Sequence, residues 1–277
     1  MASSDNIAEA NAARVQHSTF KHQVVAWVSQ HIFGSVVYTV RNGRLKGMKR
    51  KGGLGWIPRE RQSTPEDAFW NNINLRGKVV YDVGAFEGML TLYFARSAKR
   101  VVSYEPNSRN YRRLAENVRL NDLRNVTLRT IGMGKENAQV PMVQDPLVPG
   151  MASVAVGHYP TVGNSQATVE QVQVRTMDSD IVAHAQPAPD FIKIDIEGME
   201  LDALQGAEET IRNCRPQLFL EMHGDTMAQK REKTAAIVEW LLQRGYDVTH
   251  VESGTRIHRG NSATAAVGHL HAVPASG

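Results

Sequence analysis

The sequence predicts an α/β fold, in which a mostly parallel sheet carries helices on both faces. From residue 78 onward, short apolar runs alternate with longer segments of helical character, and this alternation is typical of consecutive βαβ units. With 277 residues, 42% of them apolar, the chain can bury the core that such a sheet requires. The expected strands are residues 79–83, 101–104, 126–131, 191–196 and 217–220, followed by two closing strands at 246–251 and 266–273.

The expected helices lie before and between these strands. Thr64 and Pro65 are typical of a helix start, because a hydroxyl caps the first turn and proline is favoured at its first position. This helix should end at about Ile73. The remaining helices are expected at residues 89–97, 108–121, 200–214 and 232–244.

We expect the chain to divide into an amino-terminal extension, residues 1–76, and a main domain, residues 77–277. Apolar residues at helical spacing in the first 33 positions predict one or two helices. These helices would either cover the sheet or form the interface of a homo-oligomer.

Two segments depart from the βαβ pattern. The turn dipeptide Asn42-Gly43, between the apolar runs 36–40 and 45–48, predicts a small hairpin in the extension. Residues 136–177 form a long connection that is rich in Val, Thr, Gln, Pro and Gly, which indicates an inserted hairpin or lid.

The formal net charge is only +4, but the basic residues are unevenly distributed. We interpret residues 41–61 as a solvated basic loop, with contact to an anionic partner as the alternative. The segment contains one acid, Glu60, among the basic residues Arg41, Arg44, Lys46, Lys49, Arg50, Lys51, Arg59 and Arg61.

Cys214 is the only cysteine, which excludes an intramolecular disulfide and a zinc site built from several thiolates. No apolar run approaches the roughly 18 to 20 residues of a membrane span, and the first residues lack a secretory pattern. We therefore expect a cytoplasmic protein without a membrane span.

The segment from Val79 to Gly88 reads as a buried strand, a glycine turn and the start of a helix, an arrangement that lets a nucleotide approach the backbone closely. Asp82 precedes the first glycine, Gly84. Its carboxylate would repel a pyrophosphate but not the sulfonium and ammonium of S-adenosylmethionine. The sequence therefore favours S-adenosylmethionine over NAD as the cofactor.

Glu105 ends the second strand of the main domain, 17 residues after Gly88, where an acid can accept both ribose hydroxyls of a bound nucleoside. It could at the same time stabilise the start of the next helix. The end of the third strand is expected near the adenine. The predicted cofactor-binding residues are Asp82, Gly84, Ala85, Phe86, Glu87, Gly88, Glu105, Pro106, Gly132, Met133 and Asp195.

Charged residues interrupt the fourth strand, which should be apolar on both faces if it is central in a parallel sheet. Lys193, Asp195 and Glu197 alternate with isoleucines, and burying them is costly unless they pair or serve a ligand. Lys193 would keep Asp195 ionised. A purely structural ion pair is the alternative.

His223 follows the neighbouring fifth strand, so it can join Asp195 and Glu197 at the strand ends. Any of the three could remove a proton from a substrate, and we predict Lys193, Asp195, Glu197 and His223 as the catalytic group. Two alternatives stay open: His223 bonded only to backbone, and a divalent metal held by Asp195, Glu197 and His223. We predict no metal.

These motifs resemble the FkbM family of methyltransferases over about residues 78–223. The resemblance rests on Tyr81-Asp82-Val83-Gly84-Ala85, Tyr104-Glu105-Pro106, Leu120-Asn121, Phe191-Ile192-Lys193-Ile194-Asp195-Ile196-Glu197-Gly198-Met199-Glu200, and Leu204 with Gly206-Ala207. It implies a Rossmann-like sheet of seven strands with the last antiparallel. It also implies O-methylation of hydroxyls on sugars or secondary metabolites, and amide N-methylation in some relatives. The family's usual acid after the third strand is absent at residues 132–135.

We therefore predict an S-adenosylmethionine-dependent methyltransferase that acts on a hydroxyl of a small, carrier-linked or peptide-linked acceptor. The alternatives are N-methylation of a peptide side-chain amide, methylation of a nucleic acid held by residues 41–61, and a nucleoside-binding regulator without chemistry. Nucleic acid is disfavoured, since no Asn-Pro-Pro-Tyr-type base pocket is present.

Overall fold

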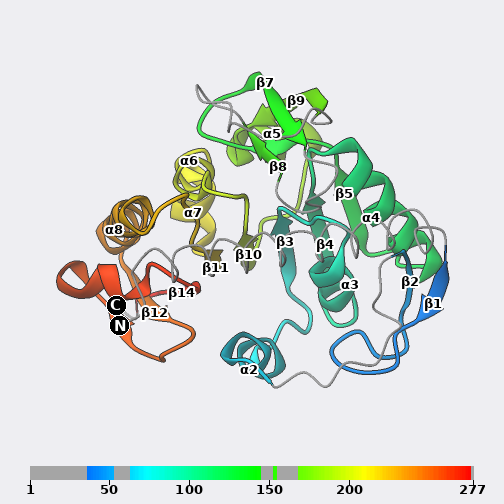
Figure 1. Cartoon of the computed structure of the whole chain (residues 1–277), viewed down its shortest axis with the longest axis horizontal. Coiled ribbons are helices and arrows are strands. Elements are labelled where there is room, and N and C mark those ends of the chain that lie inside the picture. Colours follow the sequence, from blue (N-terminus) through cyan, green and yellow to red (C-terminus); the bar gives the residue numbers. More distant parts are fainter. Residues whose placement is uncertain (1–35, 53–62, 145–151, 155–167, 276–277) are drawn as a thin grey trace, which may run out of the picture.

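The computed structural model describes residues 36–52, 63–144, 152–154 and 168–275 (Figure 1). An eight-stranded sheet forms the centre of this part, and β10 lies between β3 and β11, parallel to both. In spatial order its strands are β13 (Arg256–Ile257), β12 (Tyr246–His250), β14 (His269–Pro274), β11 (Gln217–Glu221), β10 (Phe191–Ile194), β3 (Val79–Val83), β4 (Arg100–Tyr104) and β5 (Val126–Arg129).

The predicted α/β fold with a mostly parallel sheet is confirmed. The last strand, β14, is antiparallel to both of its neighbours, β11 and β12. The sheet has one strand more than the seven expected, because the short β13 pairs with the outer edge of β12.

Helices cover both faces of the sheet (Figure 1). One face carries α2 (Pro65–Asn72), α3 (Met89–Ala95) and α4 (Ser108–Leu120), and the other α5 (Met177–His184), α6 (Glu200–Gln205), α7 (Glu208–Cys214) and α8 (Met227–Gln243). No helix in the described ranges is both long and apolar enough to cross a membrane.

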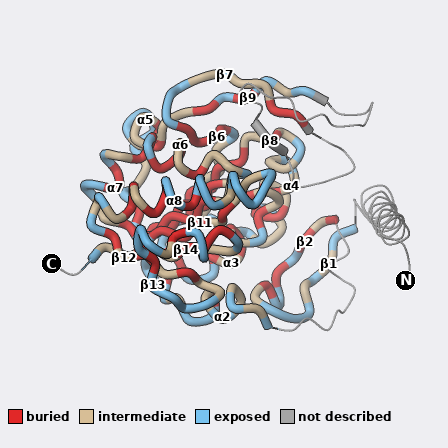
Figure 2. Tube along the Cα trace, turned by 60° about the vertical axis from the view of Figure 1, so that its left-hand side comes forward, coloured by how far each residue is buried: buried red, intermediate tan, exposed pale blue. Residues whose placement is uncertain are grey.

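Strand alternation divides the core into two layers. Val80, Phe191 and Phe219 pack with the aromatic side chains of α2 and α3. The next residues along two of these strands, Tyr81 and Ile192, pack with α6, α7 and α8. The buried residues accordingly run through the middle of the chain trace, with exposed residues on the outer sides of the helices (Figure 2).

Helix α2 agrees with its prediction at both ends. The Thr64 side chain accepts from the backbone N–H of Asp67, whose own side chain accepts from the backbone of Thr64, and the helix ends at the cap residue Ile73. Trp70 is fully buried and packs on Phe219 with ring centroids 4.4 Å apart. The capping residues thus fix the helix that packs Trp70 against the sheet.

The single helix predicted at 200–214 is wrong, since the chain forms α6 and α7 there. Asp178, on α5, accepts from the backbone N–H groups of Glu209 at 3.0 Å and Thr210 at 2.8 Å, and so caps α7 from outside. At the break, a Cβ on Gly206 would lie 2.0 Å from the carbonyl oxygen of Gly134. Contacts with distant segments therefore interrupt a locally helical sequence.

Several other element boundaries differ from the prediction. Helix α8 begins at Met227, five residues earlier than expected, because Thr226 and Gln229 form a capping box. The strand expected over 126–131 ends at Arg129, and a second sheet begins at Gly132. The strand expected over 191–196 ends at Ile194, the closing strand expected from 266 begins at His269, and the helix expected over 89–97 ends at Ala95.

The hairpin of the extension consists of β1 (Val37–Thr39) and β2 (Lys49–Lys51). Its second strand begins after the apolar run 45–48, because Leu45 and Met48 are buried against α3 and α4 instead. The helices predicted in the first 33 positions lie outside the described residues.

Three basic residues of this stretch pair with acids of the chain. Arg44 contacts Asp67 at 2.7 Å, Arg50 contacts Glu87 at 3.2 Å, and Lys51 contacts Glu116 at 2.6 Å. The interpretation as a solvated loop is wrong for these three side chains, because their partners come from α2, α4 and the turn before α3. Arg41, Lys46 and Lys49 are exposed, as expected, and Arg59 and Arg61 lie outside the described residues.

A second sheet stands beside the first and has the order β6 (Gly132–Met133), β9 (Thr168–Arg175), β7 (Ala138–Gln144) and β8 (Ala152–Val154). The antiparallel pair β7 and β9 is the core of the predicted insertion. Residues 145–151 and 155–167 lie outside the described part, so the lid role of the insertion stays a prediction, as do the domain boundaries.

Candidate functional site

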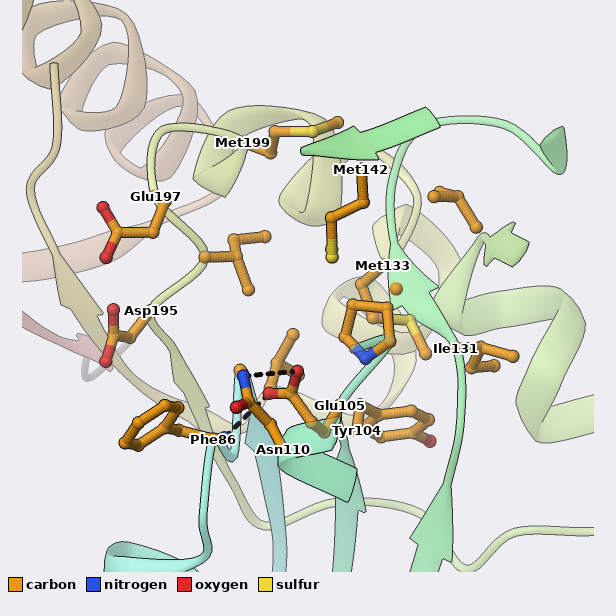
Figure 3. A pocket seen from close by; sticks show the side chains of 16 residues that line it. Phe86, Tyr104, Glu105, Asn110, Ile131, Met133, Met142, Asp195, Glu197 and Met199 are labelled. Atoms are coloured by element: carbon orange, nitrogen blue, oxygen red, sulfur yellow. Dashed lines mark hydrogen bonds between the residues drawn. The ribbon is translucent and has the colours of Figure 1, made fainter. Parts of the chain in front are cut away.

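A pocket of about 220 Å³ opens at the carboxyl ends of β3, β4 and β10, beside the second sheet (Figure 3). This edge is where open α/β sheets bind ligands. Seven of the predicted cofactor-binding residues line it: Gly84, Phe86, Glu105, Pro106, Gly132, Met133 and Asp195. Of the predicted catalytic residues, Asp195 and Glu197 line it, whereas Lys193 and His223 do not.

Glu105 lies at the end of β4 and is 6% exposed. Its Oε2 accepts from the backbone N–H of Phe86 at 2.8 Å, and its Oε1 accepts from that of Asn107 at 3.0 Å and from the Asn110 side chain at 3.4 Å. Burial raises the pKa of Glu105, and these hydrogen bonds offset part of that shift. The carboxylate therefore holds the glycine turn and faces the pocket at the same time.

Gly84 and Gly88 are required by close approaches within the protein. Gly84 has φ +80°, and a Cβ there would lie 1.8 Å from the carbonyl oxygen of Asp195. A Cβ on Gly88, the cap residue of α3, would lie 2.5 Å from Leu114. The glycines thus let the turn pack against β10 and α4. Close approach of a cofactor to the Gly84 backbone, which lines the pocket, stays a prediction.

Asp82 lies beneath the glycine turn and does not line the pocket. It is fully buried, accepts from the Thr91 hydroxyl at 2.6 Å and pairs with Lys193 at 3.5 Å. Because Lys193 neutralises it, Asp82 cannot face a bound sulfonium in the way predicted. Ala85 and Glu87 also lie outside the pocket lining: Ala85 is part of the core against α3 and α4, and Glu87 pairs with Arg50.

Lys193 is 3% exposed and joins the turn to the end of β10. Its Nζ donates to the carbonyl of Gly84 at 2.8 Å and pairs with Asp195 at 3.2 Å. Burial lowers the pKa of Lys193, but the charges of Asp195 and Asp82 outweigh it, so the pKa is raised and the side chain is an ammonium. Lys193 therefore has a structural role beneath the pocket, which corrects the prediction that it is one of the residues around the acceptor.

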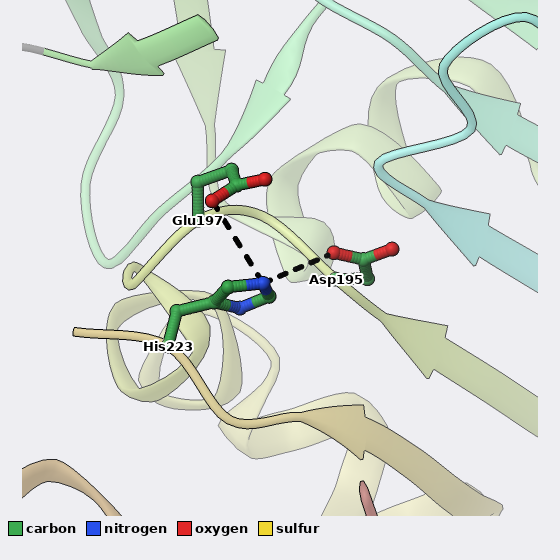
Figure 4. A group of neighbouring side chains, drawn as sticks. All are labelled: Asp195, Glu197 and His223. Carbon is green, nitrogen blue, oxygen red and sulfur yellow. Dashed lines mark ion pairs between the residues drawn. The ribbon is translucent and has the colours of Figure 1, made fainter. Parts of the chain in front are cut away.

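The predicted cluster of Asp195, Glu197 and His223 does form (Figure 4). Asp195 and Glu197 follow β10, and His223 follows the adjacent β11. The Nε2 atom of His223 lies 3.7 Å from Asp195 Oδ1 and 3.8 Å from Glu197 Oε2. One ligand atom from each side chain lies within 4.8 Å of the others, so the alternative of a divalent metal here stays a prediction, as does the absence of one.

Charges around the cluster shift two of its pKa values. Burial lowers the pKa of His223, but the hydrogen bond to Glu200 and the surrounding carboxylates raise it above its ordinary value. Burial raises the pKa of Glu197, and the nearby His223 offsets part of this shift. The alternative in which His223 bonds only to backbone is wrong, because its Nδ1 lies 2.9 Å from the Glu200 carboxylate.

Sequence reasoning missed the apolar wall of the pocket. Met142 from β7 and Met199 lie with Met133 opposite the carboxylates of Asp195 and Glu197 (Figure 3). It also missed Asn110, whose place one turn into the helix that follows Glu105 could have revealed it. No local signal marks Met142, because only the pairing of β7 with β9 brings it to the pocket.

The histidine on β14, His269, lies between two acids near this cluster. Its Nδ1 pairs with Glu252 and its Nε2 lies 3.6 Å from Glu221. Burial lowers its pKa, but the hydrogen bonds and charges of these acids raise it from 6.5 to about 9. The folded state therefore holds the proton more tightly than the unfolded chain does.

We expect this imidazolium to stabilise the fold fully below pH 6.5 and progressively less as the pH rises to about 9. After allowance for solvent screening, the loss should be about 2 kcal/mol of unfolding free energy. Urea unfolding of the wild type and His269→Gln across this range measures it, and the variant should lose less. His271→Gln is the control, since burial lowers the pKa of His271 to about 4 and keeps it neutral there. Equal slopes for wild type and His269→Gln would contradict the prediction.

Comparison with known proteins identifies the family of this chain. A family model described as the methyltransferase FkbM domain matches residues 82–248, which include the turn, Glu105 and the whole His223 cluster. The chain belongs to the FkbM methyltransferase family. The predicted resemblance is thereby confirmed, as are a methyltransferase domain and S-adenosylmethionine as its cofactor, at the level of the family.

The FkbM chain is similar to "Methyltransferase 1" of Beauveria bassiana (strain ARSEF 2860), with 27% identity over 162 residues, 52% of this chain and 60% of that protein. It thus spans less than two thirds of this relative's length. Among solved structures it is similar to the FkbM methyltransferase of Methylobacillus flagellatus KT, with 21% identity, a TM-score of 0.48, and coverage of 73% of this chain and 45% of that one. It is also similar to the ribosomal protein L11 methylase of Lactobacillus delbrueckii subsp. bulgaricus, with 12% identity, a TM-score of 0.44, and coverage of 79% and 81%.

Proposed function

We propose that this FkbM chain transfers the methyl group of S-adenosylmethionine to a hydroxyl of a sugar, a secondary metabolite or a carrier-linked small molecule. The observation that carries the proposal is a cluster of proton acceptors, Asp195, Glu197 and His223, at the rim of the pocket. Methylation of a hydroxyl requires removal of a proton, and methylation of an already nucleophilic sulfur or carbanion does not.

The pocket offers a place for each part of the cofactor. Glu105 would accept from the ribose hydroxyls, because its side chain lines the pocket at the end of β4. The apolar wall at Met133 and Met142 suits the adenine face, with backbone groups near Gly132 in place of the missing acid. The sulfonium would then lie toward Asp195, the only one of the two acids flanking Lys193 that lines the pocket.

The chain's own residues would act by position and by proton transfer. S-adenosylmethionine would supply the methyl group, which the acceptor oxygen would attack in line with the departing sulfur; the C–S bond pair would return to sulfur, and a base at the rim would take the hydroxyl proton. Holding the two reactants together supplies much of the acceleration. The base itself contributes roughly 10²- to 10⁴-fold.

N-methylation of a peptide side-chain amide is the second candidate, favoured by the same base and by the partly exposed rim, where Asp195 and Glu197 are 31% and 34% exposed. A nucleic-acid acceptor is less favoured. Arg44, Arg50 and Lys51 already pair with acids of the chain, so these three are not available to phosphates. A cytoplasmic location and a homo-oligomer stay predictions.

Incubation with S-adenosylmethionine labelled in its methyl group tests the proposal against a panel of sugars, hydroxylated metabolites, peptides and RNA. We expect label on a hydroxyl acceptor, and at least about a 100-fold lower rate in Asp195→Ala, because that variant removes a rim carboxylate. Asp202→Asn, a carboxylate lost from α6 outside the pocket lining, is the control. Label only on peptide or RNA would exclude this function, and an undiminished rate in Asp195→Ala would remove Asp195 from catalysis.

A further inference from the structure

Glu200, the first residue of α6, joins the two segments that carry the rim cluster. Its side chain is 1% exposed and does not line the pocket. Its Oε1 accepts from the backbone N–H of Gly198 at 2.9 Å and of Ile196 at 3.4 Å, and lies 2.9 Å from His223 Nδ1. One oxygen atom thus connects the loop after β10 with the histidine after β11.

This contact determines which ring nitrogen of His223 carries a proton. An ionised carboxylate only accepts hydrogen bonds, so Nδ1 must be the donor to Glu200. In the neutral ring the proton is therefore on Nδ1, and the lone pair is on Nε2. The same Nε2 faces the carboxylates of Asp195 and Glu197, at 3.7 and 3.8 Å.

The geometry fits a proton acceptor whose lone pair has a fixed direction, toward the pocket. Isolated neutral imidazole can place its proton on either nitrogen, and only one of the two forms has a free lone pair on the pocket side. Without Glu200, a neutral His223 would be free to place its proton on Nε2, where Asp195 and Glu197 would accept it. The lone pair would then point to the α6 side, away from any acceptor at the rim.

We propose that Glu200 is a positioning residue that holds His223 as the Nδ1–H tautomer, so that Nε2 takes the hydroxyl proton during methyl transfer. The acceptor oxygen forms its bond to the methyl carbon, the C–S bond breaks toward sulfur, and the proton ends on Nε2. Glu200 touches no reacting atom. This inference rests on the proposed function, since it assigns the base of that reaction.

A direct test is the ¹⁵N NMR spectrum of the His223 ring in the wild-type protein, at a pH where the ring is neutral. We expect Nδ1 to carry the proton and Nε2 to show the shift of an unprotonated nitrogen. In Glu200→Gln the side-chain amide can donate to Nδ1, so the Nε2–H form should become populated. A proton on Nε2 in the wild type overturns the proposal without any variant.

Kinetics test the consequence of this orientation. Glu200→Gln should lower kcat by at least about 100-fold, with KM for S-adenosylmethionine changed less than about 3-fold, because an orienting carboxylate acts on the proton transfer. Asp202→Asn, which removes a carboxylate two residues along the same helix, should leave both unchanged. An equal fall in kcat and in cofactor affinity, or a lower kcat with the tautomer unaltered, would make Glu200 a structural residue only.

The NMR measurement needs no acceptor, so the two proposals fail separately. If the wild type methylates no hydroxyl, the proposed function fails even where the tautomer is as expected. If the wild type methylates hydroxyls but His223 carries its proton on Nε2, only the role of Glu200 fails. Calorimetry with S-adenosylhomocysteine checks whether each variant still binds the demethylated cofactor.

Discussion

Gly84→Ala should lower the free energy of unfolding by at least about 3 kcal/mol and abolish measurable binding of S-adenosylhomocysteine. The new Cβ would lie 1.8 Å from the carbonyl oxygen of Asp195, and the backbone has φ +80°. Either the turn or the end of β10 must move, and both line the pocket. Urea unfolding and calorimetry measure the two effects.

Gly43→Ala is the matched control for this substitution. Gly43 has φ +76°, but no atom lies within 4 Å of the site of its Cβ, so only the cost of the backbone conformation applies. That cost is about 1 kcal/mol. If Gly84→Ala were no worse than Gly43→Ala, the contact between the turn and Asp195 would not hold the site together.

His223→Gln should lower kcat by about 10²- to 10⁴-fold while calorimetry shows unchanged affinity for S-adenosylhomocysteine. The ring lies beside the pocket without lining it, so the cofactor loses no contact. His258→Gln, at the cap residue that precedes the short 3₁₀ helix Arg259–Ala265, is the control. A kcat within about 3-fold of the wild type would remove His223 as the base.

The pH dependence of the wild-type rate tests the same role. A base must be neutral to accept a proton, so the rate should rise with pH through the pKa of His223. Because the surrounding carboxylates raise that pKa above 6.5, the midpoint should lie on the alkaline side of an ordinary histidine. The rising limb should be missing from the residual activity of His223→Gln.

Local sequence signals predicted the parts of the fold that local physics controls. Strand β3 and helix α2 have the predicted boundaries, because an apolar run and a capping box need no distant partner. The gathering of Asp195, Glu197 and His223 was predictable too, since parallel neighbouring strands end at one edge. Their roles as base and as cofactor contacts remain predictions.

Most features that were missed depend on partners distant in sequence; the start of α8, which a local capping box of Thr226 and Gln229 fixes, is an exception. Asp178 caps α7 and so divides the helix predicted at 200–214. Lys193 on β10 neutralises Asp82 on the neighbouring strand β3. Glu200 was quoted as part of a motif, but its function as a link to His223 is visible only once α6 and β11 are adjacent. A sequence shows which residues are costly to bury, and the fold decides which partner offsets that cost.

The walls of the pocket come from two parts of the chain: the ends of the main-sheet strands, and the second sheet. The hydrogen bonds to the Glu105 carboxylate come from the turn after β3 and the segment that starts α4. Met142 and Val174, by contrast, reach the cavity from β7 and β9. An engineer could exchange residues of these two strands to reshape the wall proposed for the adenine, while the Glu105 contacts proposed for the ribose are left in place.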